Sequence, residues 1–292
     1  MNETTQQKPS LPGPIKVQGI MSISNNEFGM IRDLVYERFG IHLTEQKKSL
    51  VVSRLQKLVR ATGFNNFKEY YNHLLTDTTN KALDQLINRI TTNYSYFNRE
   101  KDHFDFFTRN ALSEITADLK NRNINELRLW SAGCSTGEEP YMLVMLMREY
   151  FGPNYGSWDA GILATDISDR VLDIAKTGVY DLDRAMKVPV ALRNKYFTKI
   201  NNGTVVVRDD LKKEVTYRRF NLMNTMPFKK SFHMIFCRNV MIYFDKPTTD
   251  ALVKRFHSVL EPGGYFFIGH SETLGRDQNL FRYVMPACYQ KM

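Results

Sequence analysis

The clearest candidate for chemistry is the segment Leu127–Tyr141, which reads LRLWSAGCSTGEEPY. It predicts a strand, a turn that contains Gly133 and Gly137, and the start of a helix. A glycine-bearing turn after the first strand of an α/β unit lets the backbone approach a ligand closely. Two glycines are equally compatible with a tight turn that binds nothing, so the segment alone leaves both interpretations open.

The same turn also fits G-x-S-x-G, the turn that carries the nucleophile of serine hydrolases, with Ser135 as the nucleophile. Asp245 and His270 follow in the chain order that such a triad requires. Pro140 lies only five residues after Ser135 and does not suit the long helix that normally follows the nucleophile. A serine hydrolase is therefore an alternative function.

A second polar residue follows the next apolar run, where Gly161–Thr165 precedes Asp166. An acid at the tip of the second strand of a nucleotide-binding unit can accept both ribose hydroxyls. Asp166 or Ser168 could instead simply cap the next helix. Together with the glycine turn, the ribose interpretation is favoured. The pyrophosphate motif G-x-G-x-x-G is absent, which favours a nucleoside ligand without a pyrophosphate.

Two further segments combine polar and aromatic residues. Phe236–Asp245 reads FCRNVMIYFD and follows a predicted strand, whereas Thr91–Glu100 reads TTNYSYFNRE and lies between two predicted domains. Polar groups at the end of an apolar strand are typical of a site in a parallel α/β sheet. A salt-bridged loop and a linker with packed aromatic residues are the simpler alternatives.

The elements that must position these residues form two domains after a polar, Pro- and Gly-rich segment at 1–20, which predicts a flexible tail. Residues 21–92 show helical periodicity, and Ser24 with Glu27 has capping-box spacing. We expect a small all-α domain there. Residues 93–126 are then a linker and the first helix of a catalytic domain at 127–292.

The catalytic domain alternates short apolar runs with helical stretches, which predicts a doubly wound α/β fold with a Rossmann-like, mainly parallel sheet. Such sheets bind ligands at the carboxyl ends of their strands. Residues 200–219 interrupt the alternation with a turn at 201–203 and a β-branched run at 204–208. We expect a small antiparallel β insert there.

Composition limits the possible functions. The 40 Lys and Arg against 31 Asp and Glu leave a net charge of +9, which favours an acidic partner. Three scattered cysteines exclude a disulfide framework, and the six histidines lack metal-ligand spacing, so no metal site is expected. No apolar run approaches 18 residues and no signal peptide is apparent, so we expect a cytoplasmic protein without membrane insertion.

Four segments together resemble the chemotaxis receptor methyltransferases of the CheR family. They are Thr-Thr-Asn with Phe97 and Arg99, then Ser131–Tyr141, Ile235–Phe244 and Gly269–Glu272. The resemblance covers roughly residues 24–290 in consistent order. It implies an enzyme that transfers a methyl group from S-adenosylmethionine to glutamate side chains of chemotaxis receptors, leaving S-adenosylhomocysteine.

The resemblance also implies which residues contact the cofactor. By motif these are Asn93, Ser95, Arg99, Glu139, Asp166, Asn221, Leu222, Arg238 and Asn239. Asp166 would hold the ribose, Glu139 the methionyl ammonium, and Asn221 with Leu222 would flank the adenine. Family members often carry Thr where this chain has Ser95, and the hydroxyl is retained.

Methyl transfer to a carboxylate needs no general base, because a glutamate with a pKa of about 4.3 is already ionised at pH 7. The enzyme must instead align and partly desolvate the nucleophile. A guanidinium or a phenol can hold a carboxylate in line. Arg99 and Tyr243 are the candidates, and the resemblance indicates the same pair.

The expected partner is the cytoplasmic domain of a chemoreceptor, and we expect the enzyme to be a monomer. Residues 47–60 contain no acid. At 100° per residue, four basic residues of this segment fall within an arc of roughly 140° beside an apolar arc. Receptor methylation helices are acidic, so we predict docking through this basic stripe, although such stripes are usually just solvated faces. The stripe consists of Lys47, Arg54, Lys57 and Arg60.

Some members of the family bind a receptor C-terminal pentapeptide at the β insert and carry a longer Gly-rich loop there. This chain has only residues 201–203 before Thr204, so we expect independence from that tether. Two other classes stay open as alternatives: a nucleic-acid methyltransferase, suggested by the charge, and a non-catalytic S-adenosylmethionine sensor. The clearest basic cluster lies away from the predicted catalytic mouth, so no nucleic acid is expected.

Overall fold

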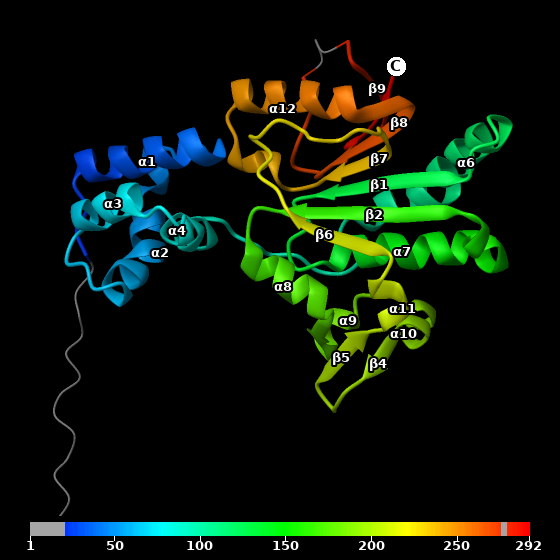
Figure 1. Ribbon diagram of the computed structural model, residues 1–292, viewed down its shortest axis with the longest axis horizontal. Coiled ribbons are helices and arrows are strands. Elements are labelled where there is room, and N and C mark those ends of the chain that lie inside the picture. Colours follow the sequence, from blue (N-terminus) through cyan, green and yellow to red (C-terminus); the bar gives the residue numbers. More distant parts are fainter. Residues whose placement is uncertain (1–20, 276–278) are drawn as a thin grey trace, which may run out of the picture.

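The computed structural model describes residues 21–275 and 279–292. The predicted tail at 1–20 lies outside these described residues. The described chain forms an all-α domain and an α/β domain that lie side by side, and the segment after α4 (Lys81–Ile90) connects them (Figure 1). This arrangement confirms the predicted fold class.

The all-α domain packs its helices around one apolar core. Ser24 caps the first helix, and its side chain and that of Glu27 form the predicted capping box. Gly40 ends this helix with φ of 69°, a conformation that glycine adopts at little cost. The elements before α4 are α1 (Asn25–Phe39), η1 (Glu45–Lys47), α2 (Lys48–Ala61) and α3 (Phe67–Thr76).

The α/β domain contains a seven-stranded sheet in the order β6-β2-β1-β7-β8-β10-β9. The first five of these strands run parallel, and the last two form an antiparallel hairpin at the edge. The strands are β1 (Glu126–Ala132), β2 (Asp159–Asp166), β6 (Val215–Arg219), β7 (Phe232–Cys237), β8 (Leu260–Ile268), β9 (Phe281–Met285) and β10 (Cys288–Lys291).

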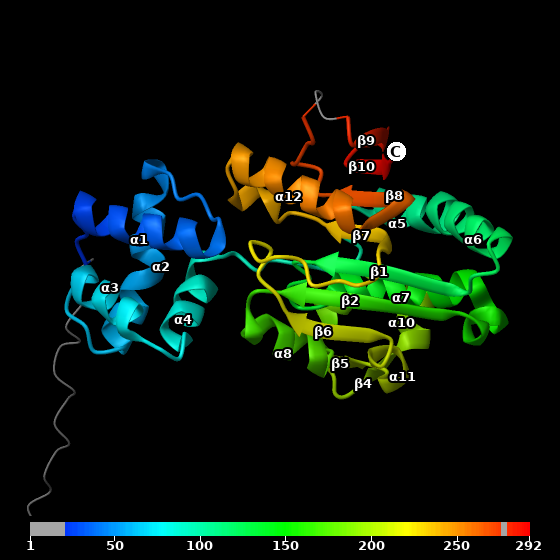
Figure 2. The same cartoon turned by 45° about the horizontal axis from the view of Figure 1, so that its top comes forward.

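Helices cover both faces of this sheet, as Figure 2 shows for α7 and α12. Adjacent residues of β1 point to opposite faces: Leu129 joins the core beneath α7, whereas Trp130 joins the core beneath α12. The helices of this domain are α5 (Lys101–Phe106), η2 (Phe107–Ala111), α6 (Leu112–Asn121), α7 (Glu138–Phe151), η3 (Gly152–Ser157), α8 (Asp169–Thr177), α9 (Leu182–Ala185), α10 (Val190–Tyr196), α11 (Asp209–Lys212), η4 (Met241–Tyr243) and α12 (Lys246–Val259).

The antiparallel insert exists, but the prediction of its bounds at 200–219 was wrong. It consists of β3 (Val179–Asp181), β4 (Phe197–Lys199) and β5 (Thr204–Val207), in the order β3-β5-β4. The segment 215–219 pairs instead with β2 as the edge of the main sheet. The outer strands β3 and β4 have only three residues each, too short to produce a recognisable alternation in the sequence.

Polar contacts join the two domains near the sheet edge. Arg219 of β6 pairs with Asp84 of α4, and it also contacts Asp169 at 3.0 Å. The hydroxyl of Tyr36 donates to Asp245 at 3.0 Å. These groups are partly exposed, so each contact adds little to stability. None of the helices in the described part of the chain combines the length and apolar character needed to cross a membrane.

Candidate active site

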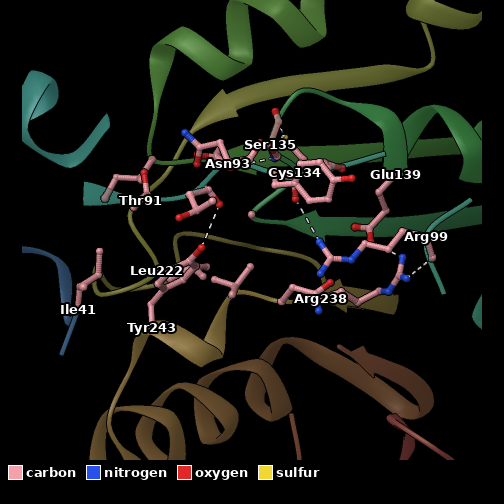
Figure 3. A pocket seen from close by; sticks show the side chains of 18 of the residues that line it. Ile41, Thr91, Asn93, Arg99, Cys134, Ser135, Glu139, Leu222, Arg238 and Tyr243 are labelled. Carbon is pink, nitrogen blue, oxygen red and sulfur yellow. Dashed lines mark hydrogen bonds and ion pairs between the residues drawn. The ribbon is translucent and has the colours of Figure 1, made fainter. Parts of the chain in front are cut away.

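A cleft opens at the carboxyl ends of β1, β2 and β7. The segment 91–96 and two residues of the all-α domain, Phe39 and Ile41, close its other side. Every residue that the sequence predicted to contact a cofactor or to align a nucleophile lines this cleft. They are Asn93, Ser95, Arg99, Glu139, Asp166, Asn221, Leu222, Arg238, Asn239 and Tyr243. Figure 3 labels Asn93, Arg99, Glu139, Leu222, Arg238 and Tyr243 among them.

The glycine turn after β1 forms the floor of the cleft. Gly133 has φ of 80°, and its amide donates to the carbonyl of Thr165 at 2.7 Å. A Cβ at Gly133 would lie 2.4 Å from Cγ2 of Val240, which also lines the cleft. Only glycine therefore fits this position, where the turn packs directly against Val240.

The structure does not assemble the serine hydrolase triad. The hydroxyl of Ser135 donates to the carbonyl of Asn93 at 3.1 Å. His270 pairs with Asp102 at 3.0 Å, and Asp245 caps α12 by accepting from the Thr248 amide. A serine nucleophile needs a histidine within hydrogen-bond reach. The hydroxyl of Ser135 is hydrogen-bonded to a backbone carbonyl instead.

Asp166 ends β2 with its side chain buried at the cleft. Its Oδ2 accepts from the Ser135 amide at 2.9 Å, and its Oδ1 accepts from the Ser168 amide at 3.0 Å. Burial raises the pKa of this carboxyl, and the backbone donors act against that rise. Ser168, and not Asp166, caps α8 through the Val171 amide. The helix-cap role that was the alternative for Asp166 therefore belongs to Ser168.

Arg238 follows β7 and is held between two carboxylates. Its guanidinium donates to Glu139 at 2.9 Å and to Glu100 at 3.0 Å. Glu139 also accepts from the hydroxyl of Ser131 at 2.7 Å. The guanidinium lies 5.2 Å from the ring centroid of Phe104. Since the Arg238 side chain is only 3% exposed, this network fixes the polar wall of the cleft.

Glu100 is a member of this network that the sequence did not single out. Burial disfavours its charged form, but Arg238, the His270 amide and Asn239 together lower its pKa below the ordinary value. Glu100 has φ of 55° and Asn239 has φ of 59°, and such left-handed residues are often found at functional sites. A signal for Glu100 was its place beside Arg99, but only the fold brings it to Arg238.

Arg99 and Tyr243 lie on different sides of the cleft. Arg99 donates to the carbonyl of Tyr94 at 3.1 Å and lies near Glu139 in Figure 3. Tyr243 lies near Leu222, and its hydroxyl donates to the carbonyl of Thr92 at 3.0 Å. The two side chains therefore border the cleft from opposite directions.

The side chains of Asn93 and Asn221, two other predicted contact residues, differ in whether the protein already satisfies their hydrogen bonds. The amide nitrogen of Asn93 is buried and has no hydrogen-bond partner among the described residues. Asn221, in contrast, donates to the carbonyl of Arg38 at 2.8 Å and accepts from the Met223 amide at 3.0 Å. Asn93 thus offers a free donor to the cleft, whereas the side chain of Asn221 anchors the end of α1.

The predicted basic stripe does not form one uniform surface. Arg54 donates to the carbonyl of Ile90 and to the hydroxyl of Thr92, the latter at 2.7 Å. It therefore links α2 to the end of α4 and to the rim of the cleft. Lys57 is exposed. The other two members are the half-buried Lys47 and Arg60.

Comparison with known proteins places both domains in one family. The family described as "CheR methyltransferase, SAM binding domain" matches residues 93–289, and "CheR methyltransferase, all-alpha domain" matches residues 26–91. The chain is 44% identical over 272 residues to the chemotaxis protein methyltransferase of Borreliella burgdorferi, covering 93% of this chain and 96% of that protein. It is 37% identical over 289 residues to chemotaxis protein methyltransferase 2 of Pseudomonas aeruginosa, covering 96% and 98%.

Proposed function

The chain belongs to the CheR methyltransferase family, and on this premise we propose that it esterifies glutamate side chains of chemotaxis receptors. S-adenosylmethionine is the methyl donor of this enzyme. One observation carries the proposal: the predicted cofactor contacts, Arg99 and Tyr243 all line a single cleft at the carboxyl ends of the strands. Parallel α/β sheets bind their ligands at this edge.

The cleft suits this cofactor chemically. The unpartnered amide nitrogen of Asn93 is a donor that a ligand can satisfy. Gly133 packs so closely against Val240 that a Cβ would clash there, and both residues line the cleft. Asp166 presents a carboxylate at the tip of the second strand, the position that holds ribose hydroxyls in nucleotide-binding sheets. Acidic groups also favour a cofactor that carries positive charge.

When bound, S-adenosylmethionine supplies a methyl group on a positively charged sulfur. We assign the ribose to Asp166 and the methionyl ammonium to Glu139, whose carboxylate has capacity beyond its bonds to Ser131 and Arg238. Asn221 and Leu222 flank the adenine, with Asn221 contributing backbone because its side chain is engaged by the protein.

The remaining task is to align the substrate carboxylate. It arrives ionised, so no proton has to be removed, and no histidine occurs among the described residues that line the cleft. Arg99 and Tyr243 border the cleft from two sides. We assign to them the orientation of the incoming carboxylate for in-line attack, with the charge of Arg99 offsetting part of the desolvation cost. Tyr243 takes part by turning its hydroxyl proton from the Thr92 carbonyl to the substrate.

The decisive experiment uses radiolabelled methyl donor and a receptor cytoplasmic fragment. We expect label to enter the fragment and to leave as volatile methanol after alkaline treatment, because a glutamyl methyl ester is hydrolysed by base. A matched fragment with its methylation-site glutamates changed to alanine should accept no label. Alkali-stable label, or label on nucleic acid alone, would contradict the proposal.

We propose that the receptor docks on the basic stripe through Lys47, Lys57 and Arg60, with Arg54 holding the linker in place. Lys57→Ala should weaken receptor binding, and its salt dependence should be smaller than that of the unchanged enzyme. Lys120→Ala, at an exposed lysine of α6, is the control and should behave like the unchanged enzyme. Receptor binding that does not depend on salt would remove the stripe from the proposal.

We also propose that this enzyme works without a receptor pentapeptide tether. The β4–β5 connection is a tight turn, in which the Gly203 amide donates to the Asn201 side chain at 2.9 Å. It lacks the longer Gly-rich loop that the family resemblance implies for tethered members. Calorimetry with such a peptide should show no tight binding, and methylation should be equal with and without the receptor C-terminus.

A further inference from the structure

A carboxylate and two histidines converge beside the cleft, at the start of α5 and just after β8. They are Glu100, His103 and His270, and one ligand atom of each lies within 4.8 Å of the others. The two imidazole rings meet edge to face with centroids 4.7 Å apart. None of the three is among the described residues that line the cleft. The histidines are 167 residues apart in the chain, so no sequence spacing reveals them.

One ring nitrogen of the buried His103 can accept a hydrogen bond but receives none from the described residues. Its ring is 0% exposed, and Nε2 lies 3.1 Å from the carbonyl of Pro286. A carbonyl can only accept a hydrogen bond, so Nε2 must carry a proton. In a neutral imidazole the other nitrogen, Nδ1, then carries a lone pair. Within the described part of the chain Nδ1 has no hydrogen-bond partner, and Glu100 Oε2 lies 3.6 Å away. Two acceptors therefore face each other in a buried place, which is unfavourable without a cation between them.

A metal ion removes this conflict, because it can bind the lone pair of a neutral imidazole and a carboxylate oxygen together.

The surroundings of both rings match those of metal ligands. Metal-binding histidines almost always donate their other N–H to a carboxylate or a backbone carbonyl. His103 donates from Nε2 to Pro286, and His270 places Nε2 3.0 Å from Asp102 Oδ2. In each ring this leaves Nδ1 as the available ligand atom. The His270 side chain is 42% exposed, so an ion can enter from solvent.

We propose that Glu100, His103 and His270 bind a divalent transition-metal ion of the Zn²⁺ class, with both histidines as Nδ1 ligands and a remaining position open to solvent. Two imidazoles and one carboxylate suit zinc, cobalt and nickel better than magnesium or calcium. Tetrahedral zinc places its ligand atoms roughly 3.4 Å apart, so the exposed His270 ring moves slightly inward when the ion binds.

Arg238 sets the strength of this site. It donates to the same Glu100 oxygen at 3.0 Å, so the ion and the guanidinium compete for one carboxylate. The site has three protein ligands and a nearby positive charge. We therefore expect weaker binding than in structural zinc sites with four ligands.

The test uses the full chain without an affinity tag, with Zn²⁺ in calorimetry and Co²⁺ in visible absorption at pH 7.5. We expect one ion per chain and the absorption bands of a low-coordinate cobalt site. The three described cysteines are buried, and burial raises the pKa of each thiol. They therefore do not compete for the ion.

Variants separate this site from adventitious binding. His270→Ala should weaken Zn²⁺ binding by at least about 30-fold, and Asp102→Asn by about 10-fold as a residue that orients His270. His42→Ala, an exposed histidine of the all-α domain, is the control and should bind normally. Both test positions are partly exposed, so the folded state survives. No binding by the unchanged chain, or unaltered binding in His270→Ala, overturns the proposal whatever the outcome of the methylation assay.

Discussion

The two walls of the cleft are built in different ways. The wall from the α/β domain consists of strand ends whose polar groups are buried and bound to backbone or to each other, as in Asp166 and Arg238. The opposite wall includes the apolar Phe39 and Ile41 of the all-α domain. It is held there by an antiparallel bridge between Ile41 and Phe244, by packing of Ile167, Tyr243 and Phe244 against the core of the all-α domain, and by partly exposed polar contacts. Cofactor binding and the placement of the second wall can therefore be disturbed separately.

The strongest test of this division is Asp166→Asn in the sheet wall. The substitution keeps size but removes the charge that we assign to the ribose, and hydrogen bonds to charged groups contribute about 1.5–3 kcal/mol each. We expect affinity for S-adenosylhomocysteine, measured by calorimetry, to fall by roughly 10- to 150-fold for each such bond that is lost. Asp173→Asn, on the exposed side of α8, should bind normally. Near-normal affinity in Asp166→Asn would remove the ribose from this wall.

Arg99→Ala should separate catalysis from cofactor binding. The guanidinium borders the cleft without contributing to the network between Glu100, Arg238 and Glu139 beyond a 4.0 Å contact with Glu100. We expect turnover to fall by about 100-fold, as for the loss of one positioned donor, with cofactor affinity changed less than about threefold. Arg99→Lys should recover part of the turnover. Equal losses in both quantities would make Arg99 a cofactor ligand only.

The glycine turn tests how rigid the sheet wall is. Gly133→Ala forces a Cβ to within 2.4 Å of Val240 at φ of 80°. Strain of this kind costs about 1–3 kcal/mol, measurable as a lower midpoint in urea. Adding Val240→Ala should restore only the part that is due to the clash, since the backbone strain persists. No loss of stability in Gly133→Ala would show that the turn can relax.

Much of the fold was predictable because strong local signals agree with the tertiary structure. The Ser24 capping box and the alternation of runs from Leu127 onward are examples, since each reports on contacts within a few residues. The bounds of the antiparallel insert and the hairpin at the edge of the main sheet were not predictable in this way. The hairpin consists of β9, a turn with Ala287 at φ of 57°, and β10, and its two strands have only five and four residues. Short edge strands obtain their stability from distant partners.

The site shows the same limit. Strand-end residues such as Asp166 and Arg238 could be found because the fold class itself brings them to one edge. Glu100 could not, because its role depends on meeting Arg238, 138 residues away. Arg54 was predicted to dock a partner, but the fold directs it to Ile90 and Thr92. Periodicity places a residue on a face of a helix and does not say which distant carbonyl lies against that face.

The smallest expected effect belongs to the contact between the domains. Asp84→Ala removes the partner of Arg219, which retains Asp169. Exposed ion pairs contribute about 0.2–1 kcal/mol, so the free energy of unfolding should change little and cofactor affinity should stay within twofold. Asp118→Ala breaks a surface pair with Arg122 in α6 and measures the background cost. Should Asp84→Ala lower cofactor affinity as much as Asp166→Asn, the all-α domain would share in holding the cofactor, and the two walls would have to be treated as one binding unit.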